Sequence, residues 1–244
     1  MNGFVDLHTH ILPWMDDGAA SLKESLAMAA MAAAHGTEVI GCTSHANGPR
    51  SAHRYDAEDF VCNCEDLQWE LDQEGIPLRL APGMEIYAGP ETPEQIRENV
   101  LIPLGKSNYY LIEFPFGESP ERMTDIIAQI RADGNRVITA HPERYDCIQS
   151  EPELAGELIQ AGALLQCNGG SLLRQFGRSA ARAAGRILEA QQYALIGSDA
   201  HDLHRRTTNI YPVYRYLSEQ YGRETADRLM KENPRRILEN EKTA

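Results

Sequence analysis

The feature that most constrains the fold of this chain is an alternation of short apolar segments with longer amphipathic ones, repeated about seven times. The apolar segments that we predict as strands are 4–7, 38–43, 78–81, 109–114, 136–140, 164–167 and 194–196. Among the helices expected around them are 57–73, 152–160 and 179–190, with two closing helices near 211–221 and 224–231. Alternation of this kind is typical of parallel βαβ units, whose crossovers are nearly always right-handed.

A closed barrel of about seven strands fits this alternation better than a two-domain division. Such barrels commonly use a chain of about this length, here 244 residues, as one unit. We therefore expect residues 1–244 to form a single domain, with 47–56 as a polar loop. The structural alternative is a doubly wound open sheet, which would normally carry a glycine-rich first turn. Residues 7–18 contain no such turn.

The composition excludes several classes of partner. The chain has 23 Lys and Arg against 36 Asp and Glu, a formal net charge of −13. This charge argues against nucleic acid as the main partner. A small anionic substrate stays compatible with it, because bound cations reverse the sign of a site locally. No run of 18 apolar residues and no signal peptide is recognisable, so we expect no membrane span and a cytoplasmic location.

The five cysteines have no regular spacing, and we predict reduced thiols. Thiol-dependent tyrosine phosphatases carry the motif Cys-x5-Arg, in which an arginine follows the nucleophilic cysteine by six positions. The residues at that distance here are Gly48, Gln68, Glu70, Glu153 and Leu173. None of them is arginine, which excludes a cysteine mechanism of that type.

Side chains that can bind metal follow the predicted strands at their carboxyl ends. His8 and His10 are two residues apart at the end of the first strand, so both point the same way. The full set is His8, His10, His45, Glu85, Glu113, His141, Asp199 and His201. Because barrel active sites are built at this end of the strands, we expect these side chains to meet.

Imidazole and carboxylate groups without thiolates suit manganese, iron(II) or zinc, and there are enough of them for two or three ions. Glu113 is the most informative, because a carboxylate in an apolar strand is costly unless it is paired or bound to metal. Asp16 and Asp17 are close competitors as a further ligand, although both could be turn residues. His8 alone could equally be a hydrogen-bonded strand-end histidine.

Two arginines follow predicted ligands closely: Arg144 comes after His141, and Arg206 comes after His201. The planar guanidinium group presents a fork of donors that matches phosphate oxygens. We therefore predict that Arg144 and Arg206 bind phosphate, although each could instead form a surface ion pair.

Taken in order, these motifs resemble those of the PHP (polymerase and histidinol phosphatase) superfamily. More closely, they resemble the bacterial manganese-dependent protein-tyrosine phosphatases of the CpsB/CapC/YwqE type. The matching segments are 6–13, 16–18, 43–45, 82–86, 111–114, 140–145, 168–172, 176–178 and 197–201, which span nearly the whole chain. The resemblance implies a distorted TIM-like (β/α)7 barrel of PHP type that holds three ions, Mn²⁺ with Fe²⁺ or Zn²⁺ as substitutes.

The resemblance also implies particular residue roles. Its ligand sets are His8, His10, Glu85 and Asp199 for one ion; Glu85, Glu113 and His141 for a second; and Asp17, His45 and His201 for a third. It places Asp17 rather than Asp16 at the ligand position and marks Arg144 and Arg206 as phosphate-binding. The loop after His45 departs from the family, which is often rich in basic residues there, whereas this chain reads His45-Ala46-Asn47-Gly48-Pro49-Arg50.

The activity implied is hydrolysis of phosphotyrosine on a protein by a metal-activated hydroxide, with phosphate as product. Arg144 and Arg206 would neutralise the charge that develops on the phosphoryl oxygens. His141 and Asp199 are candidates for proton handling, although metal ligands are poor free acids. The implied partner is the tail of a bacterial tyrosine autokinase that controls capsule or exopolysaccharide synthesis.

Three other functions stay open on the sequence. A small-molecule PHP phosphatase, such as a histidinol-phosphatase, would use the same ligands, although segment 233–238 and the compact length favour the tyrosine-phosphatase branch. An amidohydrolase also opens with His-x-His but commonly needs a carbamylated lysine on the fourth strand, where this chain has Glu113. A non-catalytic, metal-stabilised interaction protein would bind metal without turnover.

Overall fold

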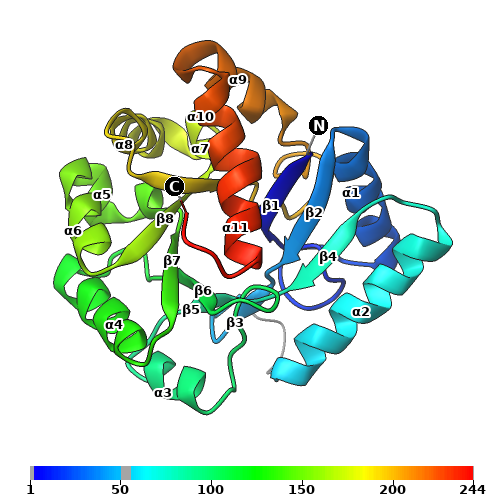
Figure 1. The fold of residues 1–244 in the computed structure, drawn as a ribbon, viewed down its shortest axis with the longest axis horizontal. Coiled ribbons are helices and arrows are strands. Elements are labelled where there is room, and N and C mark those ends of the chain that lie inside the picture. The colour runs from blue at the N-terminus through cyan, green and yellow to red at the C-terminus, as the bar shows by residue number, and fades with distance from the viewer. Residues whose placement is uncertain (1–2, 51–55, 244) are drawn as a thin grey trace.

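A ring of parallel strands surrounded by helices forms the body of the protein, as Figure 1 shows. The structure is a computed structural model that describes residues 3–50 and 56–243. Its strands are β1 (Phe4–Thr9), β2 (Thr37–Cys42), β3 (His45–Ala46), β4 (Arg79–Pro82), β5 (Glu85–Tyr87), β6 (Tyr109–Glu113), β7 (Arg136–Ala140), β8 (Ala163–Asn168) and β9 (Tyr193–Gly197). All strand pairs among the described residues are parallel.

The ring is distorted because two of its strands are interrupted, and each continues as a second, short strand. β2 continues into β3, and β4 continues into β5, after two intervening residues in each case. The hydrogen-bonded order is β1-β2-β4 in one sheet and β3-β5-β6-β7-β8-β9 in the other. A bridge between Thr9 and Ala200 closes the ring beyond the end of β9, and the Asp199 N–H donates to the His8 carbonyl at 2.8 Å.

Helices connect successive strands of the ring and cover its outside (Figure 1). They are α1 (Leu22–Ala34), α2 (Ala57–Gln73), α3 (Thr92–Arg97), α4 (Pro120–Ala132), α5 (Asp146–Ser150), α6 (Ala155–Gln160), α7 (Gly169–Leu172), α8 (Gly177–Glu189), α9 (Tyr211–Tyr221), α10 (Arg223–Asp227) and α11 (Asn233–Leu238). At the start of α1 the Ser21 hydroxyl accepts from the Glu24 N–H and so caps the helix.

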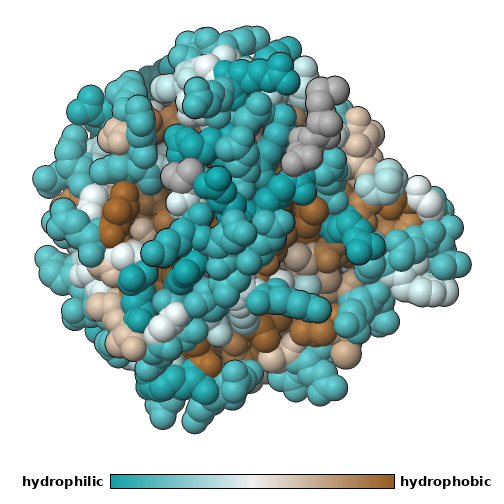
Figure 2. Space-filling model, viewed as in Figure 1, coloured by the Kyte–Doolittle hydropathy of each residue, from teal (hydrophilic) through white to brown (hydrophobic). Residues whose placement is uncertain are grey.

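Apolar side chains fill the inside of the ring and close its N-terminal end. Val5, Leu7 and Ile138 are buried there, and Ile237 of α11 packs against the same cluster with no exposed surface. Figure 1 shows α11 crossing the ring, and Figure 2 shows mainly hydrophilic side chains on this face, with hydrophobic patches between the helices. A second, larger cluster lies between the strands and the outer helices. α11 therefore closes the end of the ring opposite the strand ends that carry the predicted ligands.

The predicted barrel is confirmed, with each of its seven predicted strands present among the described residues. The closed ring excludes the doubly wound open sheet. Two helix predictions are wrong in detail: 152–160 divides into the 3₁₀ turn Pro152–Leu154 and α6, and the closing helices are followed by a further helix, α11. Pro234 lies in the first turn of α11, a position that suits proline because its missing N–H is not needed there.

Within the polar loop 47–56, residues 51–55 lie outside the described part of the chain. No helix formed by residues 3–50 and 56–243 has both the length and the apolar character needed to cross a membrane.

The closure of the barrel by α11 predicts a large cost for truncating its central side chain. Ile237→Ala should lower the free energy of unfolding by about 2–5 kcal/mol, because it removes buried methyl groups and leaves a cavity. Chemical denaturation measures this change. The control is Val100→Ala, at a side chain that is 42% exposed, which should change stability by about 0.5 kcal/mol or less. Equal effects of the two substitutions would contradict the role of α11.

Candidate metal centre

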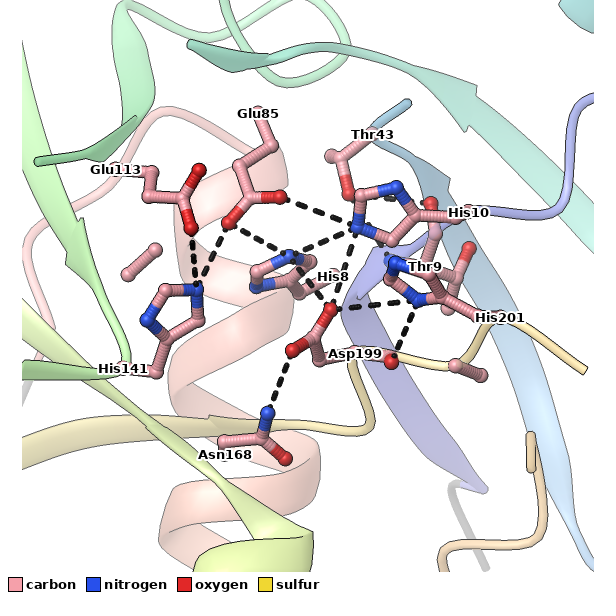
Figure 3. A network of polar contacts seen from close by, with 12 residues as sticks. His8, Thr9, His10, Thr43, Glu85, Glu113, His141, Asn168, Asp199 and His201 are labelled. Carbon is pink, nitrogen blue, oxygen red and sulfur yellow. Dashed lines mark hydrogen bonds and ion pairs between the residues drawn. The ribbon is translucent and has the colours of Figure 1, made fainter. Parts of the chain in front are cut away.

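The structure brings all nine predicted ligand residues together at the C-terminal end of the barrel. Figure 3 shows most of them pointing toward one another from separate strands and strand-end loops. They are His8 on β1, His10 and Asp17 in the loop after β1, His45 on β3, Glu85 on β5, Glu113 on β6, His141 after β7, and Asp199 and His201 after β9. All except Asp17 are buried.

The first ligand set implied by the resemblance is present as a compact group. His8 Nε2 lies 3.2 Å from Glu85 Oε1 and 3.4 Å from Asp199 Oδ1. His10 Nε2 lies 3.2 Å from Glu85 Oε2 and 3.3 Å from the same Asp199 oxygen. One donor atom from each residue lies within 4.8 Å of the others, a spacing that could hold one ion.

The ligand set that contains Asp17 is also assembled, and the geometry distinguishes Asp17 from Asp16 as the ligand candidate. Asp17 Oδ1 lies 3.4 Å from both His45 Nε2 and His201 Nε2, and His10 joins this group. Asp16 is turned away, because its oxygens lie 2.7 Å from His10 Nδ1 and accept the backbone N–H groups of His45 and Gly18. Asp17 is thus free to act as a ligand, whereas Asp16 orients one.

The set around Glu113 is arranged less simply than the resemblance implies. His141 Nε2 lies 2.9 Å from Glu85 Oε1 and 3.7 Å from Glu113 Oε1, so the expected trio is in contact. His45 Nδ1 also reaches Glu85, at 3.0 Å, and Glu113, at 3.9 Å. The two ring nitrogens of His45 therefore face two different groups of donors, which sequence spacing could not predict.

The second ring nitrogen of three histidines is held by a partner outside the donor groups. His8 Nδ1 lies 2.8 Å from Gln166 Oε1, His10 Nδ1 contacts Asp16, and His201 Nδ1 lies 3.0 Å from the Asp199 carbonyl. Metal-binding histidines are almost always oriented in this way, since the partner fixes the tautomer and the ring plane. In all three residues Nε2 is left pointing into the cluster.

The donor atoms of the cluster are a good match for metal ions. Among residues 3–50 and 56–243, several buried atoms of the cluster make no hydrogen bond, which is costly in an apolar surrounding. They are His45 Nε2, Glu85 Oε2, Glu113 Oε2, Asp199 Oδ1 and His201 Nε2. Imidazole nitrogens and carboxylate oxygens without thiolates suit Mn²⁺, Fe²⁺ or Zn²⁺. Bound ions would satisfy these atoms, so the residues present fit the metal.

Two ligand candidates are held in unusual backbone conformations. His141 has φ = 30° and Asp199 has φ = 54°, both in the left-handed region that non-glycine residues rarely adopt. Each follows directly or closely after a strand, β7 or β9, so the left-handed turn redirects the side chain over the end of the ring. Such strain is typical of functional sites, where the surrounding structure stabilises the conformation.

The cluster shifts the ionisation of its members in opposite directions. Burial opposes the charge of Glu85, but attraction to His8 and close contacts with the other imidazoles hold the pKa of its carboxyl well below the usual range. Burial and repulsion by Glu85 raise the pKa of Glu113. Burial, together with repulsion by the Arg144 guanidinium, lowers the pKa of His141 to about 4. A neutral His141 has the lone pair that metal binding needs.

Both predicted phosphate-binding arginines lie at the edge of the cluster and meet at Asp199. Arg144 Nη1 donates to Asp199 Oδ2 at 3.1 Å, Arg206 Nη2 forms an ion pair with the same oxygen, and the Asn168 amide donates to it at 2.6 Å. The Phe176 ring lies 4.7 Å from the Arg144 guanidinium and 5.6 Å from that of Arg206. Both arginines therefore form an ion pair, as the alternative interpretation expected, but with a buried carboxylate and not with one at the surface.

Sequence reasoning missed four residues of the site. Asn168 ends β8, so the strand-end rule that identified the ligands could have found it. Arg50 donates to Glu113 Oε1 at 2.6 Å from a loop whose path has no sequence signal. Phe116 and Phe176 flank the Arg144 guanidinium at 4.8 and 4.7 Å. Aromatic residues in loops are usually interpreted as packing, and only the fold places these two against an arginine.

Comparison with known proteins places the chain in a family. The CpsB/CapC family of capsular polysaccharide synthesis matches residues 4–239. The chain belongs to the CpsB/CapC family. It is 31% identical over 237 residues to the tyrosine-protein phosphatase YwqE of Bacillus subtilis, covering 97% of this chain and 92% of YwqE. It is 28% identical over 239 residues to the tyrosine-protein phosphatase CpsB of Streptococcus pneumoniae, covering 96% of this chain and 98% of CpsB.

Solved structures support the same membership. A structure from the pair YwqE of Bacillus subtilis and CpsB of Streptococcus pneumoniae, described as unique metal-dependent tyrosine phosphatases, matches this CpsB/CapC member with a TM-score of 0.92. The identity is 31%, with 98% of this chain and 96% of the other covered. An organophosphorus hydrolase of Deinococcus radiodurans matches with a TM-score of 0.62 at 12% identity over 97% of this chain and 93% of its own. That likeness shows the shared barrel fold alone.

The contact between Asp16 and His10 predicts that the Asp16 carboxylate contributes to metal affinity. Asp16→Asn should weaken Mn²⁺ binding by about 10–100-fold. The substitution leaves every proposed ligand in place but removes the carboxylate that orients His10. Titration of the metal-free protein by calorimetry measures the affinity. Asp125→Asn, at an exposed position of α4, is the matched control and should leave it unchanged. Unchanged affinity in the Asp16 variant would contradict the orienting role.

Proposed function

We propose that this protein is a metal-dependent protein-tyrosine phosphatase that hydrolyses phosphotyrosine on another protein. The observation that carries the proposal is the pair of guanidinium groups, Arg144 and Arg206, held on one buried carboxylate of a histidine and carboxylate cluster. A phosphate monoester needs positive charge on its oxygens and an activated water, and this arrangement can provide both. Membership in the CpsB/CapC family and the names of the relatives support the same activity.

We assign the ions as follows, with residues 1–244 acting as one metallophosphatase domain. His8, His10, Glu85 and Asp199 hold one ion; Glu85, Glu113 and His141 hold a second; and Asp17, His45 and His201 hold a third. Mn²⁺ is the proposed metal, with Fe²⁺ or Zn²⁺ as substitutes, since all three accept mixed nitrogen and oxygen ligands. Support comes from the distances within each set, with His10 and His45 also near a neighbouring set.

When bound, the ions supply positive charge at the phosphoryl group and lower the pKa of the attacking water. The residues of the chain bind and orient the substrate. Arg144 and Arg206 present their forks to the phosphoryl oxygens and neutralise the charge that grows on them during transfer. Asp199 holds both guanidiniums in place through Oδ2, while its other carboxylate oxygen faces His8 and His10. One carboxylate thus fixes the phosphate site relative to the metal site.

Proton handling by His141 and Asp199 stays a prediction. Burial opposes the charge of Asp199, but the Arg206 guanidinium and the imidazoles of His8 and His10 hold the pKa of its carboxyl well below the usual range. His141 Nε2 is directed at Glu85. Both side chains are therefore held by contacts within the cluster. A phenolate leaves more easily without a proton than an alkoxide does, because the pKa of a phenol is only about 10.

The exposed ring of Phe116 beside Arg144 offers a contact for the phenyl ring of an aryl phosphate. The Phe116 ring is 37% exposed, lies 4.8 Å from the Arg144 guanidinium and packs edge-on at 6.2 Å from the ring of His141. A phenyl ring attached to a phosphate at Arg144 would meet this face, and aromatic pairs of this kind add about 0.5–1.5 kcal/mol. We propose on this basis that the substrate is a tyrosine phosphate and not a histidinol-type ester.

The proposed substrate protein is a bacterial tyrosine kinase whose phosphorylated tail is accepted by this site in the cytoplasm. The support is the family name, which links CpsB/CapC proteins to capsular polysaccharide synthesis. By this proposal the phosphatase resets the kinase and so regulates capsular or exopolysaccharide synthesis. Phosphate is the second product.

The leading proposal predicts a distinctive pattern of inhibition. Purified protein with Mn²⁺ should release phosphate from phosphotyrosine peptides much faster than from histidinol phosphate. Turnover should survive alkylation of the cysteines and stop when a chelator removes the metal, because no thiol takes part. Phosphate release measured side by side on the two substrates checks this. A reaction that is insensitive to chelator, or a preference for histidinol phosphate, would overturn the assignment, and metal binding without turnover would favour the interaction-protein alternative.

The arginine pair predicts a loss of activity without loss of metal. Arg144→Lys and Arg206→Lys should each lower kcat/KM for a phosphotyrosine peptide by about 10²–10³-fold, since lysine keeps the charge but not the fork. Arg205→Lys is the control, at an exposed position next to Arg206 in sequence. Metal content, measured by mass spectrometry, should match the parent protein in all three. Equal activity of the Arg205 and Arg206 variants would refute the phosphate-binding role.

A further inference from the structure

A groove lined by arginines lies beside the proposed phosphate site, between α8 and α9. Its volume is about 470 Å³, and its lining consists of Leu172, Arg174, Arg178, Ala181, Arg182 and Tyr216. Arg174 belongs to the short connection between α7 and α8, while Arg178 and Arg182 are one helical turn apart on α8. We call this surface the arginine groove. Figure 1 shows α7, α8 and α9 gathered on one side of the barrel.

The charge of the arginine groove is not neutralised by the protein. Within residues 3–50 and 56–243, no ion pair involves Arg174, Arg178 or Arg182, and Arg182 donates only to the Gln149 carbonyl. Arg186, the next arginine along the same face of α8, differs because it pairs with Glu153 at 3.3 Å and Glu189 at 3.8 Å. Three exposed, unpaired guanidiniums are notable in a chain with a net charge of −13.

The 173–176 segment connects the lining of the arginine groove to the proposed phosphate site. Phe176 stands between Arg174 and Arg178 in sequence, and its ring packs against the guanidiniums of Arg144 and Arg206. A smaller cavity of about 190 Å³ is lined by Leu173, Gln175 and Arg206, on the other side of the same connection. A peptide that places its phosphate at Arg144 and Arg206 therefore has a polar route over the 173–176 segment to the groove.

We propose that the arginine groove binds acidic residues that flank the phosphotyrosine of the substrate protein. This inference rests on the proposed function and adds a preference for substrate sequence. Leu172 and Tyr216 offer apolar surface for the aliphatic part of Asp or Glu side chains, and the guanidiniums pair with their carboxylates. A long polyanion such as nucleic acid is disfavoured, because the rest of this acidic chain repels it.

The test compares two phosphotyrosine peptides that differ only in their flanks, one with Asp and Glu and one with Asn and Gln. In the parent protein kcat/KM should be higher for the acidic peptide, chiefly through KM. In the double variant Arg178→Gln/Arg182→Gln the ratio of the two values should fall toward one, by about 2- to 30-fold for two exposed ion pairs. Raising the salt concentration should reduce the ratio in the parent protein in the same way.

The control is Arg186→Gln, which removes one positive charge one turn further along α8, from an arginine that already has carboxylate partners. It should leave the acidic-to-neutral ratio unchanged, along with turnover of p-nitrophenyl phosphate. A ratio near one in the parent protein, or equal falls in the ratio for both variants, would overturn the proposal. Because the ratio is taken within one protein, partial loss of folded enzyme does not alter it.

Failure of the proposed function would look different, because neither phosphotyrosine peptide would then be hydrolysed. In that event, binding of fluorescent acidic and neutral peptides that carry a non-hydrolysable phosphonate in place of the phosphate measures the same preference by anisotropy. Tighter binding of the acidic peptide, lost in the double variant and kept in Arg186→Gln, supports the groove. Equal binding of the two peptides overturns it.

Discussion

Four imidazoles converge on one buried carboxylate, and the rest of the site is arranged around that contact. Glu85 is 1% exposed, and its oxygens lie 2.9–3.2 Å from ring nitrogens of His8, His10, His45 and His141. A carboxylate so deeply buried would be protonated without these partners. They come from β1, the loop after it, β3 and the end of β7, so the contact exists only when the barrel is closed. Metal binding at this point therefore stabilises the closed ring as well as the site.

Asp199 links the proposed metal site to the proposed phosphate site. One of its oxygens faces His8 and His10, and the other accepts from Arg144 and Arg206. Its left-handed backbone, with φ = 54°, is held by the bond from its N–H to the His8 carbonyl where β9 returns to β1. Closure of the barrel thus sets the distance between the proposed metal-binding groups and the proposed phosphate-binding groups, which this one strained residue joins.

Much of the fold could be predicted because it follows from local patterns. The apolar strands and amphipathic helices have distinct periods, and the alternation of parallel strands with helices leaves few topologies. The errors fell where local signals are short or mixed. The 152–160 segment contains too few residues for a clear helical period, and α11 has two buried apolar residues, Pro234 and Ile237, in a single short helix. Its role is decided by the open N-terminal end of the ring, which sequence patterns do not describe.

The sequence by itself identified the strand-end histidines and carboxylates of the candidate site. Parallel strands of one barrel end at the same face, so a polar residue at a strand end is already assigned to that face. Only the tertiary structure decided how those residues are grouped. It turned Asp16 toward His10 and Asp17 toward His45 and His201, gave His45 contacts with two groups of donors, and brought Arg50 from a loop onto Glu113. Spacing along a strand specifies direction, whereas neighbours across the ring depend on stagger and closure, which involve residues far apart in the chain.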